Sequence, residues 1–69
     1  MPQQELSKRD QDLLTIKAMR TYGGSFVARL GEAAMYADDL NLQIIKESFQ
    51  HHWNRYTKIA MREQEEQSA

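Results

Sequence analysis

The sequence predicts an all-α fold, a three-helix hairpin-type bundle with a long C-terminal helix that is completed by self-association. Apolar residues recur at spacings of three and four, which is the period of an amphipathic helix. The pattern is interrupted at Gly23-Gly24 and again at Asp38-Asp39, so it divides into three segments. No stretch alternates apolar and polar residues with the two-residue period of a strand.

The small size of the chain is the reason to expect self-association. At about 60 residues a domain buries only ~60% of the surface that its unfolded chain exposes. Domains of this size usually need disulfides, a metal ion or a partner subunit. The chain has 69 residues and no cysteine. We therefore expect one domain over residues 1–69 that forms a homodimer, with flexible ends at residues 1–7 and 64–69.

The first helix is expected from about Lys8 to Tyr22. Ser7 is suited to cap it, because a serine followed three residues later by an acid, here Asp10, is a helix-start pattern. Gly23 follows directly and would end the helix in a left-handed conformation, which glycine adopts without steric cost.

The second helix is expected from about Phe26 to Ala37, with Ser25 as its N-cap residue. Its apolar face contains several small residues, which suit close packing against a neighbouring helix. Gly31 lies within that helix although glycine costs up to ~1 kcal/mol of helix propensity relative to alanine. We therefore expect a close backbone contact at Gly31.

The third helix is expected from Asp39 to about Arg62, with Asp38 or Asp39 accepting from the free amides at its start. Its apolar seam is formed by Leu42, Ile45, Phe49, His52, Tyr56 and Ile59. The seam favours one continuous helix, and a bend near Phe49–His52 stays an open alternative.

Aromatic residues form the candidate interaction surface. Tryptophan and tyrosine dominate the binding energy of many protein interfaces. A domain of this size is not expected to cover Trp53 alone, although burial in the core is an equal alternative for these side chains. The surface comprises Tyr22, Phe26, Phe49, Trp53 and Tyr56.

The glycine turn is a candidate anion site. The free amides at a helix N-terminus can bind a phosphate or a carboxylate, and cations precede and follow this turn. The candidate residues are Arg20, Gly23, Gly24, Ser25 and Arg29. A plain helix–helix turn is the stronger alternative, because the lysine and the spacing of a phosphate-binding loop are missing.

The residues predict no catalytic site, cofactor or metal ion. His51 and His52 are adjacent, so on a helix they point about 100° apart and cannot chelate one ion. Asp38 and Asp39 are explained as caps, and a chain this short offers little room for a substrate cleft. We therefore expect a protein that is not an enzyme.

Charge and hydropathy favour neither nucleic acid nor membrane as a partner. The formal net charge is −1, and no apolar run approaches the ~20 residues that cross a bilayer. In a helix–turn–helix arrangement the second helix would contact DNA, yet it offers only Arg29. The cations Arg55, Lys58 and Arg62 are explained by the dipole at the end of the third helix. We expect a cytoplasmic protein.

A further indication comes from the run IKAMRTYGGSFV at residues 16–27, followed by Leu30, Ala33-Ala34, Ala37-Asp38, Asn41, Phe49, Trp53 and Tyr56. Over residues 16–56 this pattern resembles a group of short uncharacterised proteins from phages and prophages. In that group one proline follows the aspartate that corresponds to Asp38, and another follows the phenylalanine that corresponds to Phe49. This chain has Asp39 and Gln50 at those two positions. The departure favours a continuous third helix over a break at Phe49.

These observations favour a small cytoplasmic module that binds another protein. The resemblance implies a phage or prophage accessory protein that modulates a host factor. A small-anion or nucleotide-binding protein that uses the glycine turn is the first alternative, and a DNA-binding regulator is the second.

Overall fold

The computed structural model describes residues 7–68, which form four helices and no strand. They are α1 (Lys8–Tyr22), α2 (Ser25–Tyr36), α3 (Asp39–Ser48) and α4 (Gln50–Ser68). The prediction of an all-α bundle is confirmed for these residues. Of the predicted flexible ends 1–7 and 64–69, residues 1–6 and 69 lie outside the described residues, whereas Ser7 caps α1 and residues 64–68 belong to α4.

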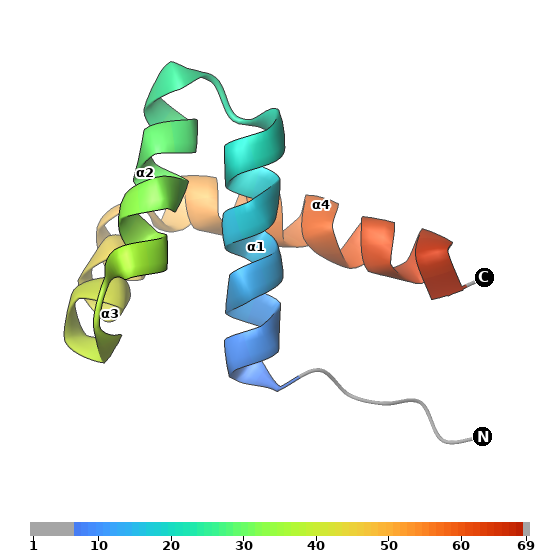
Figure 1. The fold of residues 1–69 in the computed structure, drawn as a ribbon, viewed down its shortest axis with the longest axis horizontal. Coiled ribbons are helices and arrows are strands. Elements are labelled where there is room, and N and C mark those ends of the chain that lie inside the picture. Colours follow the sequence, from blue (N-terminus) through green and yellow to red (C-terminus); the bar gives the residue numbers. More distant parts are fainter. Residues whose placement is uncertain (1–6, 69) are drawn as a thin grey trace.

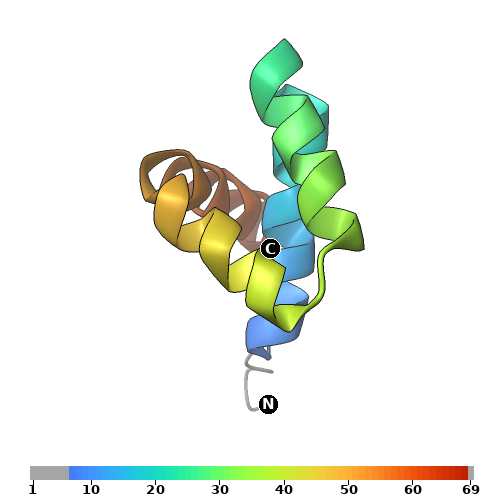
Figure 2. The ribbon, with the colours of Figure 1, turned by 90° about the vertical axis from the view of Figure 1, so that its left-hand side faces the viewer.

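The first two helices form an antiparallel pair, and α4 runs across α1 on one side of that pair (Figure 1). The short helix α3 leads from the end of α2 to the start of α4, as the second view also shows (Figure 2). Helix α1 is therefore central, because it packs against both α2 and α4.

The start of α1 is as predicted, but the reason for the glycine at its end is different. The Ser7 side chain accepts from the Asp10 amide at 3.1 Å. Gly23 has φ −71° and ψ 152°, so the predicted left-handed conformation is wrong. A Cβ at Gly23 would lie 2.5 Å from the Met19 carbonyl oxygen and 2.6 Å from Cγ1 of Val27. Glycine is needed here because the turn lies directly against both helices.

The second helix begins one residue earlier than predicted. Gly24 is its N-cap residue, and no side chain caps it, so the assignment of Ser25 as the cap is wrong. The close contact expected at Gly31 is confirmed. A Cβ at Gly31 would lie 2.9 Å from the Met19 Cβ and 3.2 Å from the Ile16 carbonyl oxygen. The absence of that carbon allows α1 and α2 to approach each other.

The predicted third helix is two helices, so the prediction of one continuous helix is wrong. Asp38 caps α3 as expected, accepting from the Asn41 amide at 2.8 Å. The break falls at Phe49, whose φ of −121° and ψ of 40° are not helical. The change of direction there allows Leu42 on α3 and Trp53 on α4 to pack on the same core. Helix α4 then continues beyond the predicted end at Arg62.

The core lies where α1 meets α2 and α4. Its buried apolar side chains are Ile16, Ala18, Met19, Val27, Ala34, Trp53, Tyr56 and Ala60. Thr15 is also buried, and its hydroxyl lies 2.8 Å from the Thr57 hydroxyl. One of these hydroxyls donates to the other, and the accepting hydroxyl can donate to a carbonyl of its own helix. The Thr15 hydroxyl lies 3.0 Å from the Gln11 carbonyl oxygen, and the Thr57 hydroxyl lies 2.8 Å from the Trp53 carbonyl oxygen. The polar pair is satisfied, so it connects α1 to α4 without an unpaired buried group.

Candidate functional site

The structure separates the predicted aromatic surface into buried and exposed parts. Trp53 is 5% exposed and Tyr56 is 9% exposed, and both belong to the core. They are therefore not part of an exposed interaction surface in this structure. Trp53 and Tyr56 are buried because they lie on the side of α4 that packs against α1.

Phe26 and Phe49 meet at the joint between α3 and α4. The Phe26 ring lies edge-on to Phe49 at 5.7 Å and to His52 at 5.9 Å between centroids. Such edge-to-face pairs add about 0.5–1.5 kcal/mol beyond the burial of area. The contact holds the start of α2 against the joint, while Phe26 remains more than half exposed.

Tyr22 lies apart from that cluster and reaches α4 by a hydrogen bond. Its hydroxyl donates to the Glu63 carboxylate. This hydrogen bond and the negative charge of Glu63 raise the pKa of Tyr22 above its ordinary value of 10.0. Tyr22 therefore connects the end of α1 to α4 instead of joining Phe26 in one surface.

The residues of the predicted anion site do not converge. The Arg20 guanidinium donates to the Met35 sulfur at 3.3 Å, near the far end of α2 from the glycine turn. Arg29 pairs with Glu32 on its own helix at 3.4 Å. The amides that follow Gly24 have no side-chain cap, but neither cation is placed beside them. The turn is explained by the packing of Gly23.

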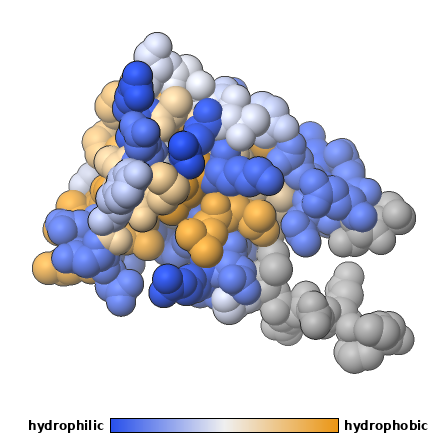
Figure 3. Space-filling view, in the orientation of Figure 1, coloured by the Kyte–Doolittle hydropathy of each residue, from blue (hydrophilic) through white to orange (hydrophobic). Residues whose placement is uncertain are grey.

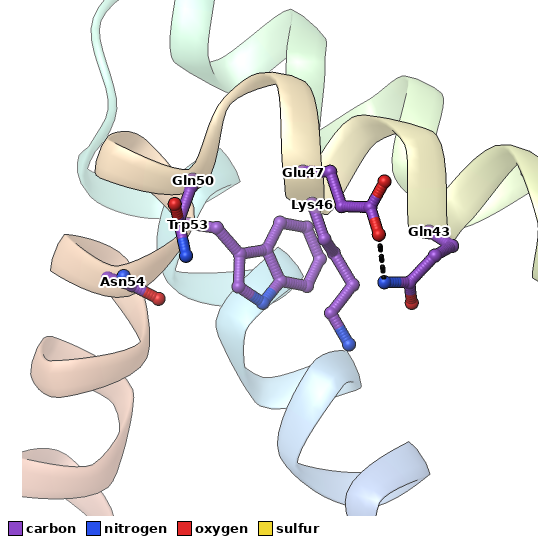
Figure 4. A pocket seen from close by; sticks show the side chains of 6 residues that line it. All are labelled: Gln43, Lys46, Glu47, Gln50, Trp53 and Asn54. Atoms are coloured by element: carbon purple, nitrogen blue, oxygen red, sulfur yellow. Dashed lines mark hydrogen bonds between the residues drawn. The ribbon is translucent and has the colours of Figure 1, made fainter.

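A shallow pocket of about 240 Å³ lies between α3 and α4. Figure 4 shows the Trp53 indole between the α3 side chains and those at the start of α4. The lining residues are Gln43, Lys46, Glu47, Gln50, Trp53 and Asn54. Its volume is below the ~300–1,000 Å³ of most small-molecule sites.

The polar groups of this pocket are largely engaged with one another or with α1. The Lys46 ammonium donates to both Asp12 carboxylate oxygens and lies 5.7 Å from the Trp53 ring centroid. Gln43 donates to Glu47 at 2.9 Å. The pocket therefore offers few unpaired hydrogen-bonding groups to a ligand. The contacts of its lining side chains stabilise the position of α3 instead.

Several exposed apolar residues at the end of α2 and on α3 are not among the predicted interaction residues. Four of them follow one another along the end of α2 and the outside of α3, and we call them the α2–α3 ridge. Figure 3 shows hydrophobic surface at its lower left edge, where α3 lies. The members and their exposures are Met35 at 39%, Tyr36 at 80%, Leu40 at 71% and Ile44 at 50%.

The described residues contain no group of potential metal ligands and no helix that could span a membrane. No three His, Cys, Asp or Glu side chains within residues 7–68 lie close enough together to hold an ion. No helix in this part of the chain combines the length and the apolarity needed to cross a bilayer.

Comparison with protein-family models, curated proteins and solved structures finds no match.

Proposed function

We propose that the chain is a small module that binds another protein through the α2–α3 ridge, and that it acts by binding and not by catalysis. The observation that carries the proposal is that Leu40 and Ile44, four residues apart on one face of α3, are 71% and 50% exposed, while Tyr36 at the end of α2 is 80% exposed. Apolar side chains that gather on the surface in this way are typical of protein interfaces.

The ridge is exposed because α3 packs against the core with its opposite face. Leu42 and Ile45 lie on the other side of α3 and pack against the core. Side chains at Leu40 and Ile44 then face away, because neighbouring positions on a helix point about 100° apart. Rotation of α3 would exchange one exposed pair for the other, so the ridge stays available to a second protein.

The first partner to test is a second copy of the chain. Small domains without disulfides often gain stability by self-association, and a two-fold contact would place one ridge against the other. The resemblance to phage and prophage proteins supports a host factor as the further partner, whose activity the binding would modulate.

The test is a comparison of two variants. In Leu40→Gln/Ile44→Gln the apolar ridge is removed, and in Leu13→Gln an equally exposed apolar residue of α1 is removed, since Leu13 and Ile44 are both 50% exposed. Sedimentation equilibrium over a range of concentrations measures self-association. A photo-cross-linking residue at Tyr36 reports the bound chain.

We expect the wild type and Leu13→Gln to associate and to cross-link, and the ridge variant to do neither. Equal association of all three proteins would refute the ridge as the interface. A wild type that stays monomeric and cross-links to no other chain, in the presence of host extract, would refute the proposed function.

A further inference from the structure

Helix α4 carries a row of cations on its outer side. Arg55, Lys58 and Arg62 are exposed, and His51 precedes them by one turn. The spacings of four, three and four residues place all of them on one face of the helix. We call Arg55, Lys58 and Arg62 the basic row.

The predicted explanation for these cations is wrong. It required the helix to end near Arg62, whereas α4 continues to Ser68 and has no basic residue in its last turn. Arg55 lies in the first half of α4, where the dipole does not favour a positive charge. The helix dipole therefore does not account for the row.

Ion pairing within the chain does not account for it either. Among residues 7–68 the ion pairs are Arg29 with Glu32 and Lys46 with Asp12. The three cations of the row are in neither pair. Their charges remain available to an external anion.

The composition of this face distinguishes between kinds of partner. The exposed large apolar side chains of the described residues are Leu13, Tyr22, Phe26, Met35, Tyr36, Leu40 and Ile44, all outside α4. Protein interfaces have an apolar centre from which charged residues are depleted. Interfaces with DNA are more polar and much more positively charged. From His51 to Arg62 the outer face of α4 has the second composition.

We propose that the basic row binds the phosphate backbone of duplex nucleic acid. From Arg55 to Arg62 the helix rises about 10.5 Å, and one strand presents a phosphate every ~3.4 Å of duplex axis. The row can therefore reach about three phosphates. A single strand would need exposed aromatic side chains beside the row for stacking, but Trp53 and Tyr56 on α4 are buried.

Two features limit the strength and the extent of this contact. Glu65 and Glu66 follow the row on the last turns of α4, and their exposed carboxylates repel phosphates, so the contact ends at Arg62. The formal net charge of −1 gives no long-range attraction. Binding therefore depends on the row itself and is favoured at low ionic strength, where screening is weak.

The experiment measures fluorescence anisotropy of a labelled 20-base-pair duplex and of the matching single strand between 20 and 200 mM salt. Three proteins are compared: the wild type, Arg55→Gln/Lys58→Gln/Arg62→Gln, and the control Lys8→Gln/Arg9→Gln/Lys17→Gln. The control removes the same number of exposed cations from α1. Circular dichroism verifies that all three proteins keep their helices.

We expect the duplex affinity of the wild type to fall about 500-fold over this tenfold rise in salt, as about three phosphate contacts require. The α4 variant should bind at least tenfold more weakly at the lowest salt, and the α1 control should keep its affinity. No duplex binding by the wild type, equal losses in both variants, or tighter binding of the single strand would each overturn the proposal. These results do not depend on the α2–α3 ridge, which is unchanged in every protein.

Discussion

The Lys46 ammonium on α3 donates to both carboxylate oxygens of Asp12 on α1, at 3.2 and 3.0 Å. The two side chains are only 16% and 13% exposed, so the pair is largely removed from solvent. This single ion pair joins two helices that make few other contacts. Together with the packing of Leu42 and Ile45 on the core, it contributes to the position of α3 and therefore to the direction in which the α2–α3 ridge faces.

Asp12→Asn should destabilise the fold by about 1–3 kcal/mol, because the Lys46 charge loses its carboxylate partner while it stays partly buried. Urea unfolding followed by circular dichroism measures the change. Lys46→Met and the double variant complete a thermodynamic cycle. A coupling energy near zero would mean that the pair contributes nothing to the attachment of α3.

Glu63→Gln should lower the pKa of Tyr22, because the negative charge and the carboxylate acceptor that favour the neutral phenol are both removed. The folded pKa of Tyr22 is raised, so the stabilisation from this contact is present below the ordinary value of 10.0 and is lost as the pH rises through the folded pKa. Absorbance titration at alkaline pH measures the shift, and Tyr22→Phe identifies which tyrosine is responsible. An identical titration curve for Glu63→Gln would show that the two side chains are not in contact.

Gly31→Ala should destabilise the fold although alanine is the better helix former. A Cβ would lie 2.9 Å from that of Met19, and α1 would have to move. Overpacking of this kind costs about 1–3 kcal/mol, against up to ~1 kcal/mol of gained helix propensity. Thermal unfolding is the measurement. A higher melting temperature for Gly31→Ala would show that the helices are further apart than described.

Gly24→Ser should stabilise the protein by about 0.5 kcal/mol, because it supplies the side-chain cap that α2 lacks. The position has room for the new side chain, since no atom lies within 4 Å of an added Cβ. Its φ of −71° suits residues other than glycine. The same unfolding measurement tests this change, and a lower stability would mean that the turn is constrained by something other than its own backbone.

Local patterns predicted the helices that depend on local chemistry. The bounds of α1, the caps at Ser7 and Asp38, and the close contact at Gly31 could all be inferred from residue types and spacing. A bend near Phe49–His52 stayed an open alternative, but the sequence could not decide for the break at Phe49, because no glycine or proline marks it. At the break Phe49 packs against Phe26, which is distant in the sequence.

The candidate surfaces were harder to predict than the helices. Trp53 could belong to a core or to an interface until the crossing of α1 and α4 was known. The predicted apolar seam contains Leu42 and Ile45, which pack on the core. It does not contain Leu40 and Ile44, which lie on the other side of the same helix. The spacing of four residues between Leu40 and Ile44 was the signal that could have identified the part of the ridge on α3.

Helix α3 packs on the rest of the molecule only through partly buried side chains, and this affects the dynamics of the molecule. None of its residues is buried, so opening α3 exposes less apolar surface than opening any helix of the core. Segments with few buried contacts have the lowest free energies of local unfolding. We expect the α3 amides to exchange with deuterated solvent faster than those in the middle of α1. The segment that presents Leu40 and Ile44 is then also the one that opens most easily, which would allow the α2–α3 ridge to adapt to the proposed partner.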